Sequence, residues 1–133
     1  MDDDAIDRQL IGYAFGRADA DVTLHECDGG RDALDFINGA GRHVGAKRPH
    51  ACLLDVKMPD VSGIEVLKAI KQDPKARSIQ VVMISSSDRN ADVDACYKNH
   101  ANGYVCKPLK SADLNKTIRA LSNLWINVYR LPT

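Results

Sequence analysis

The chain has 133 residues, near the commonest size of a single domain, with 18 basic and 18 acidic residues and a formal net charge of zero. This balance argues against a nucleic-acid partner, because nucleic-acid-binding proteins normally show a basic stripe. No segment approaches the roughly 20 apolar residues of a membrane span, and residues 1–4 do not resemble a secretory signal. We therefore expect a cytoplasmic protein that contacts neither nucleic acid nor membrane.

Segments with helical and strand-like patterns alternate along the chain. In chain order the patterns predict a helix at 4–17, a strand at 22–27, a helix at 32–38, a strand at 50–55, a helix at 62–72, a strand at 79–85, a helix at 88–99, a strand at 103–107 and a helix at 111–127. Ser62 and Glu65 are placed to form a capping box at the start of one of these helices. The alternation predicts an α/β protein with a doubly wound parallel sheet covered by helices on both faces.

The four cysteines are Cys27, Cys52, Cys96 and Cys106. They form no C-x-x-C pair, and the histidines do not stand at the spacings of known metal sites. Because cysteine is among the most buried residue types, we expect buried, reduced thiols with a packing role.

Three of the predicted strands end at a chemically reactive side chain. Asp55 directly follows an apolar run, Ser85 ends the next strand, and Lys107 ends the last one. In a parallel sheet these ends lie at one edge, the edge where open α/β sheets bind ligands. We therefore expect the three side chains to converge there, joined by Asp2 and Asp3 if a strand precedes that pair.

These side chains suit the transfer of a phosphoryl group to a carboxylate. Mg²⁺ held by carboxylate and carbonyl oxygens would offset the charge of Asp55 and of the phosphoryl group. The Lys107 ammonium could pair with Asp55 and later with a phosphate oxygen, to which the Ser85 hydroxyl could also donate. Taken singly, the three have ordinary explanations as a turn former, a loop serine and a solvated lysine. Their joint occurrence at strand ends predicts that Asp55 is phosphorylated with Mg²⁺ as cofactor.

Four motifs stand out along the chain: Asp55-x-x-Met58-Pro59-x-x-Ser62-Gly63, Val81-Val82-Met83-Ile84-Ser85, Gly103-Tyr104-Val105-Cys106-Lys107-Pro108, and the acidic pair Asp2-Asp3 with Arg8 in the first helix. With these motifs the chain resembles, over essentially its whole length, the receiver domain of bacterial two-component response regulators. Ser85 stands where threonine is commoner in that family, but the hydroxyl is retained. The resemblance implies a flavodoxin-like fold with the sheet order 2-1-3-4-5.

The resemblance also implies a role for each site residue. Asp55 would accept a phosphoryl group from a histidine kinase, and Lys107 and Ser85 would contact the phosphate. Mg²⁺ would be bound by Asp3, Asp55 and the main-chain carbonyl of Lys57, with Asp2 assisting through water. Ser85 and Tyr104 would form the switch that responds to phosphorylation, and Lys57 and Ser87 would flank the water that hydrolyses the phosphoryl group. The bond from Lys107 to Pro108 would be cis. A stand-alone receiver of this kind catalyses only its own phosphorylation and dephosphorylation and signals by protein contact.

The start of the chain departs from the family pattern. The first strand of the family should precede Asp2 and Asp3, yet only Met1 stands there. This strand is central in the sheet, so its loss would leave a vacant position and place the metal ligands on an unsupported end. Three explanations remain open, namely a shortened N-terminus, a partner chain that fills the position, or the C-terminal tail.

The tail at 124–133 is predicted to be an extension of the receiver domain at 1–123. It resembles the aromatic-Leu-x-x-Val-x-Leu-Pro ending of single-domain regulators that partner bacterial phytochromes, which would make a bacteriophytochrome the kinase. Its strand-prone sequence favours a role in forming a homodimer. The alternative is that Trp125 simply packs on the core at the end of the last helix.

Two other functions fit parts of the pattern. A phosphatase of the haloacid dehalogenase type also uses Asp, Ser or Thr, Lys and Mg²⁺, but it needs an acid/base Asp two residues after the nucleophile, where this chain has Lys57. The other alternative is an interaction module with the shape of a receiver that no longer takes phosphate, because Asp2 and Asp3 are not held in place.

Overall fold

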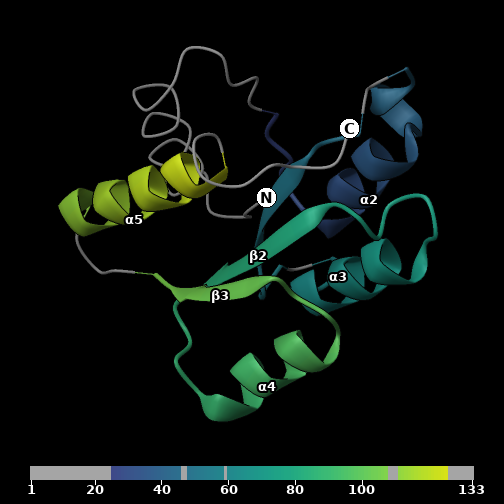
Figure 1. The fold of residues 1–133 in the computed structure, drawn as a ribbon. Coiled ribbons are helices and arrows are strands. Elements are labelled where there is room, and N and C mark those ends of the chain that lie inside the picture. Colours follow the sequence, from purple (N-terminus) through teal and green to yellow (C-terminus); the bar gives the residue numbers. More distant parts are fainter. Residues whose placement is uncertain (1–24, 46–47, 59, 108–110, 126–133) are drawn as a thin grey trace.

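A computed structural model of the protein describes residues 25–45, 48–58, 60–107 and 111–125. In chain order these contain α2 (Gly30–Asn38), the 3-10 helix η1 (Gly41–His43), β1 (Ala51–Asp55), α3 (Gly63–Gln72), β2 (Gln80–Ser85), α4 (Asn90–Lys98), β3 (Gly103–Cys106) and α5 (Ser111–Asn123). The strands form a sheet with helices on both of its sides (Figure 1). Within the described ranges, no helix is both long and apolar enough to cross a membrane.

The described strands form a parallel sheet in the order β1-β2-β3. Side chains along β1 alternate between the faces, with Cys52 and Leu54 in one core cluster and Leu53 in the other. Val81 and Val82 of β2 separate in the same way. Both faces are therefore buried, which explains why these strands read as continuous apolar runs and not as alternating ones.

Different helices cover the two faces of the sheet. The larger cluster joins one face to α2, α3 and Cys96 of α4, and its fully buried members include Val66, Leu67 and Ile70 of α3. On the opposite face, Leu114 and Ile118 of α5 pack with Trp125, which is 9% exposed. Figure 1 shows this arrangement, with α5 on one side of the sheet and α2 and α3 on the other. Trp125 thus belongs to the core, as the alternative reading of the tail proposed.

Most predicted elements are present, with their ends shifted by a few residues. Helix α2 begins at Gly30 and not at Asp32, α4 spans Asn90–Lys98 within the predicted 88–99, and α5 ends at Asn123. The capping prediction for α3 is confirmed in part, because the Ser62 Oγ accepts a hydrogen bond of 3.2 Å from the Glu65 N–H. Residues 126 and 127, the end of the helix predicted at 111–127, lie outside the described residues.

The strand predicted at 22–27 is not seen in its described part. Residues 25–27 are not in a strand, because a strand requires a hydrogen-bonded neighbour and none of the three described strands pairs with them. Residues 22–24, the helix predicted at 4–17, the position of the family's first strand and Pro108 lie outside the described residues. The three strands correspond to the part 3-4-5 of the expected order.

The prediction that the cysteines are buried is wrong for one of them. Cys27, Cys52 and Cys96 are buried, whereas Cys106 is exposed at the end of β3, and none of the four forms a disulfide. Burial raises the pKa of the Cys52 thiol to about 11, so this thiol is protonated at neutral pH. Cys106 is accessible because it is the last residue of a strand with only one neighbour in the described sheet.

Candidate functional site

The carboxyl edge of the sheet brings Asp55 and Lys107 into direct contact. Asp55 is the last residue of β1 and is 5% exposed, and Lys107 directly follows β3. The Lys107 Nζ donates a hydrogen bond of 2.8 Å to the Asp55 Oδ2 across 52 positions of sequence. A buried carboxylate is costly unless its charge is balanced and its oxygens are hydrogen-bonded. Because the parallel sheet aligns the ends of its strands, Lys107 lies close enough to balance the charge of Asp55.

Each oxygen of the Asp55 carboxylate has its own donor. The Lys57 N–H donates to Oδ1 at 3.0 Å, while Lys107 holds Oδ2. Lys57 directs its exposed side chain away from the protein interior and contributes its backbone to the site. The carboxylate is therefore held in one orientation at the end of β1, with a cation beside it.

Ser85 ends the neighbouring strand, one residue beyond Ile84, which is the register partner of Asp55. It ends β2 and is 1% exposed, and its Oγ accepts a hydrogen bond of 3.2 Å from the Ser87 N–H. The Ser85 carbonyl accepts from the Lys107 N–H at 2.7 Å. This bond continues the β2–β3 ladder by one residue and places the Lys107 backbone beside the edge where Asp55 lies.

Tyr104 is linked to the loop that follows β2. Its hydroxyl donates a hydrogen bond of 2.7 Å to the carbonyl of Ser87, and the Ser87 Oγ donates to the Asp92 carboxylate in α4. Burial raises the pKa of the Tyr104 phenol, which keeps it a neutral donor. A connected path therefore runs from β3 through this loop to α4. Asp92 was missed by the sequence analysis, because a first-turn helix acid has no distinguishing pattern.

Gly63 allows α3 to begin directly against the end of β1. The Gly63 N–H donates to the Val56 carbonyl at 2.9 Å, and a Cβ at this position would lie 1.8 Å from the Asp55 carbonyl oxygen. No side chain fits in that space. The Ser62-Gly63 part of the motif thus fixes where α3 starts relative to Asp55, by capping at Ser62 and by close approach at Gly63.

Asp60 connects the loop after β1 to helix α2. Its carboxylate accepts hydrogen bonds from the N–H groups of Gly30 at 3.1 Å and Arg31 at 3.0 Å. Hydrogen bonds from the backbone, first Val61 and then Arg31, hold the pKa of Asp60 below its usual value. An anion at a helix N-terminus also interacts favourably with the helix dipole. The sequence analysis missed this cap, since the two segments lie about 30 positions apart in the chain.

We expect Asp60→Asn to reduce the amount by which the free energy of unfolding falls when the pH is lowered into the acid range. A carboxyl with a lowered folded-state pKa stabilises the fold above its unfolded pKa, about 3.9, and this contribution is lost as the pH falls through the folded value. The measurement is the free energy of unfolding in urea at a series of pH values from about 3 to 7. Asp94→Asn, an exposed change on α4, is the control and should keep the wild-type slope. Equal slopes for both variants would contradict the cap.

We expect Lys107→Met to lower the free energy of unfolding by about 1–3 kcal/mol, because the buried Asp55 carboxylate loses its charge partner. The double variant Asp55→Asn with Lys107→Met should be destabilised by less than the sum of the single variants, since it removes the charge as well as its partner. Urea unfolding without divalent ions measures all four proteins. Strict additivity would show that the two side chains are not energetically coupled.

Part of the predicted metal site can be examined in the described residues. Asp55 and the main-chain carbonyl of Lys57 offer hard oxygen donors at the end of β1, and such donors suit Mg²⁺ or Mn²⁺. Asp2 and Asp3 lie outside the described residues. Lys57 and Ser87, the residues predicted to flank the hydrolytic water, follow β1 and β2 at this same edge. The donor chemistry of the described part therefore fits the predicted ion.

The fold and the strand-end geometry agree with the comparison to known families. A sequence model of the response regulator receiver domain matches residues 1–119. The chain belongs to the receiver domain family. Receiver domains of response regulators are signalling domains, and their partners are histidine kinases. The resemblance noted from the motifs is therefore confirmed.

Individual relatives of this receiver domain cover nearly the whole chain. It is 33% identical over 135 residues to the probable methanogenesis regulatory protein FilR2 of Methanothrix harundinacea, an alignment that covers 99% of this chain and 84% of the relative. It is 31% identical over 132 residues to the response regulator Rcp1 of Synechocystis sp., covering 99% of this chain and 90% of the relative.

Solved structures of related receivers match the fold. The crystal structure of the phosphorylated cyanobacterial phytochrome response regulator RcpA superposes with a TM-score of 0.96 at 28% identity, covering 100% of this chain and 95% of the other. The Mn²⁺-bound form of Rcp1 gives 0.94 at 31% identity, covering 100% and 96%. The flavodoxin-like receiver fold and the similarity to single-domain phytochrome-associated regulators are thereby confirmed.

Proposed function

We propose that this receiver domain accepts a phosphoryl group on Asp55 from a histidine kinase and transmits the signal by protein contact. The observation that carries the proposal is the buried Asp55 carboxylate at the end of β1, paired with Lys107 at 2.8 Å. In the reaction, a carboxylate oxygen attacks the phosphorus of the phosphohistidine. The P–N bond breaks, an acyl phosphate forms on Asp55, and the released imidazole takes up a proton.

The residues around Asp55 have complementary tasks in this proposal. Lys107 balances the carboxylate charge before transfer and can pair with a phosphate oxygen afterwards, and Ser85 can donate its hydroxyl to another. Mg²⁺ bound by Asp3, Asp55 and the Lys57 carbonyl, with Asp2 assisting, would offset the negative charge that gathers as the phosphoryl group is transferred. Lys57 and Ser87 lie in the loops beside the acceptor and would influence hydrolysis of the acyl phosphate.

Phosphorylation would change the surface formed by α4, β3 and α5. If the Ser85 hydroxyl turns toward the phosphate, its hydrogen bond with the Ser87 N–H is exchanged. Ser87 also binds Tyr104 and Asp92, so the rearrangement would reach β3 and α4 together. The proposal therefore assigns Ser85 and Tyr104 to a two-state switch whose populations depend on phosphorylation.

The test incubates the purified full chain with a small acyl phosphate donor, with and without Mg²⁺, and follows the intact mass. The proposal expects one phosphoryl group per chain, added only in the presence of Mg²⁺ and lost over time by hydrolysis. A folded protein that never gains mass would support the interaction module without phosphate chemistry. Rapid turnover of added phosphoesters without a lasting mass change would support the phosphatase.

The phytochrome link and the dimer also belong to the proposal. The relatives Rcp1 and RcpA support a bacteriophytochrome as the kinase, and a kinase of that kind would act in the cytoplasm. The proposed organisation is a receiver at 1–123 and an extension at 124–133 that joins two copies. Trp125 packs on Leu114 and Ile118, so the first part of the proposed extension is anchored on the core of the domain.

We expect deletion of residues 126–133 to convert a homodimer into a monomer while the domain stays folded. The shortened chain keeps Trp125 and thereby the core contacts of α5. Light scattering of the separated species gives the mass in solution, and circular dichroism checks the fold. A full-length chain that is monomeric, or a dimer that survives the deletion, would refute the proposed role of the tail.

A further inference from the structure

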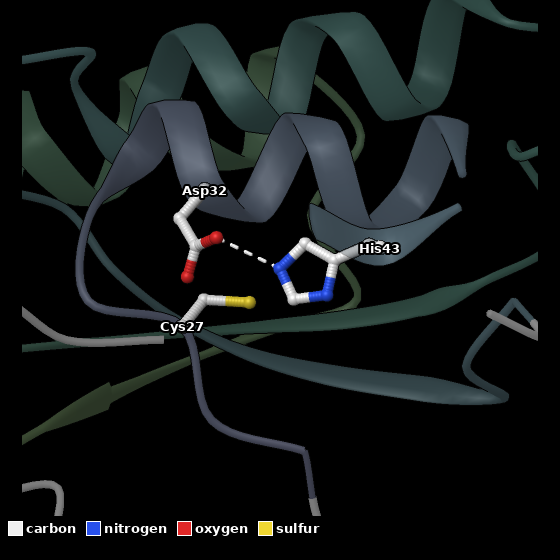
Figure 2. Close-up of side chains that lie close together, drawn as sticks. All are labelled: Cys27, Asp32 and His43. Carbon is white, nitrogen blue, oxygen red and sulfur yellow. Dashed lines mark hydrogen bonds and ion pairs between the residues drawn. The ribbon is translucent and has the colours of Figure 1, made fainter. Parts of the chain in front are cut away.

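A second group of chemically reactive side chains is formed by helix α2 and the segments on either side of it. Cys27, Asp32 and His43 each place one donor atom within 4.8 Å of the others. The His43 Nε2 lies 2.7 Å from the Asp32 Oδ1, at hydrogen-bond distance. Figure 2 shows the Asp32 carboxylate facing the imidazole, with the Cys27 thiol pointing toward the same ring. The cluster is sheltered, since Cys27 is 1% exposed and the side chains of His43 and Asp32 are 12% and 13% exposed.

The chain reversal after α2 brings His43 back to the helix. Gly39 ends α2 in the left-handed conformation with φ 64°, and Gly41 opens η1 with φ 58°. Glycine adopts such angles without strain. The His43 ring then packs edge-on against Phe36, with centroids 5.0 Å apart. The backbone turns at Gly39 and Gly41 and the contact with Phe36 thus hold the His43 ring in place.

Asp32 is also held in place. It lies in the first turn of α2, and its Oδ2 accepts a hydrogen bond of 3.2 Å from the Asp28 N–H. The other oxygen, Oδ1, is directed at His43. Hydrogen bonds of this kind orient ligating carboxylates in metal sites.

We propose that Cys27, Asp32 and His43 form a Zn²⁺ site separate from the phosphoacceptor site. A thiolate, an imidazole and a carboxylate are the three ligand types that Zn²⁺ uses, and a site with three protein ligands keeps a fourth position for water. The thiolate and imidazole exclude Mg²⁺ and Ca²⁺, which prefer oxygen ligands throughout. Nitrogen and oxygen ligands of a tetrahedral Zn²⁺ lie about 3.3 Å apart, so the Asp32 Oδ1 and the His43 Nε2, now 2.7 Å apart, need to separate by about 0.6 Å. The Cys27 Sγ, within 4.8 Å of the other donor atoms, needs to come to about 3.6 Å from them.

Two simpler explanations account for less of the geometry. A Cys-His-Asp nucleophile would need a thiol that a substrate can reach, whereas Cys27 is 1% exposed. A plain Asp32–His43 pair would not require a thiol directed at the same imidazole. An ion is small enough to enter a sheltered cluster, and binding it would tie the segment before α2 to both α2 and η1.

The test titrates the purified full-length Asp55→Asn protein with Zn²⁺ against a chromophoric chelator, and with Co²⁺ followed by absorption spectroscopy. Because Asp55 is a proposed metal ligand, the Asp55→Asn background should weaken metal binding at the phosphoacceptor edge. We expect one Zn²⁺ per chain, and a Co²⁺ complex with a thiolate charge-transfer band and the intense visible bands of a tetrahedral site. Asp32→Asn and His43→Gln should each weaken binding at least tenfold, and Cys27→Ser should remove the charge-transfer band.

The controls are chosen to separate this cluster from adventitious binding. His50→Gln and Cys106→Ser change an exposed histidine and the exposed thiol, and both should bind Zn²⁺ as the parent does. Circular dichroism checks the fold of each variant. If Cys27→Ser does not fold, the Zn²⁺ affinities of Asp32→Asn and His43→Gln test the proposal. The proposal would be overturned if the parent bound no Zn²⁺. It would also be overturned if Asp32→Asn and His43→Gln bound Zn²⁺ as the parent does, or if Cys106→Ser lost the binding.

Discussion

Asp55→Asn is expected to abolish incorporation of the phosphoryl group from either a histidine kinase or a small acyl phosphate. The amide has nearly the same size and can still accept the Lys57 N–H, but it lacks the anionic oxygen that attacks phosphorus. The fold should survive, because the change removes a buried charge and keeps the shape. Intact-mass measurement after incubation with the donor and Mg²⁺ reports the loss directly.

The matched control for this result is Asp60→Asn. Asp60 is the next carboxylate along the same loop, yet it caps α2 and is exposed to solvent. Its amide variant should still be phosphorylated, with at most a modest change in rate. Label that persists in Asp55→Asn, or that disappears equally in both variants, would show that Asp55 is not the acceptor.

Gly63→Ala is expected to lower the free energy of unfolding by about 1–3 kcal/mol or more, at the level of severe overpacking. The added Cβ would lie 1.8 Å from the Asp55 carbonyl oxygen, and that oxygen belongs to the backbone and cannot swing aside. Relief requires α3 and the end of β1 to separate, which also displaces Asp55. Urea unfolding should therefore show the loss of stability, and mass spectrometry should show slower phosphorylation.

Gly103→Ala provides the comparison for this variant. A Cβ at Gly103 would lie 3.5 Å from the Val82 side chain, an ordinary van der Waals contact, and the residue is also at a strand position. Its stability should stay within about 0.5 kcal/mol of the wild type, as for a well-tolerated substitution. Equal stability of Gly63→Ala and Gly103→Ala would show that α3 can move away from β1 without cost.

Local patterns were sufficient to predict that Asp55, Ser85 and Lys107 lie at one edge of the sheet, because each stands at the end of a strand. The apolar runs that end at Asp55 and Ser85 identify buried strands, and parallel strands have to align their carboxyl ends. From this the sequence alone predicts that Asp55 and Lys107 share an edge, and the 2.8 Å contact between them agrees. The Ser62 cap of α3 follows in the same way, since capping depends on residues three positions apart.

Boundaries were less predictable, since helix and strand ends depend on neighbours as well as on local preference. Helix α2 starts at Gly30 because the Asp60 carboxylate, about 30 positions away in sequence, satisfies its first N–H groups. The segment 25–27 has strand-forming residues but pairs with none of the described strands. Cys106 was expected to be buried, and only its place at the end of β3 shows that it is exposed.

The sequence by itself determined the α/β class, through its periodicity, and the family, through motifs that resemble those of receiver domains. It also predicted that Asp55, Ser85 and Lys107 share one edge of the sheet, because each stands at the end of a strand. Only the tertiary structure decided that Asp60 caps α2, that Tyr104 is linked through Ser87 to Asp92, and that Cys27, Asp32 and His43 converge. Such contacts join residues with no regular spacing. They form where turns and packing bring residues that are distant in sequence into contact, and no local sequence pattern specifies which residues will meet.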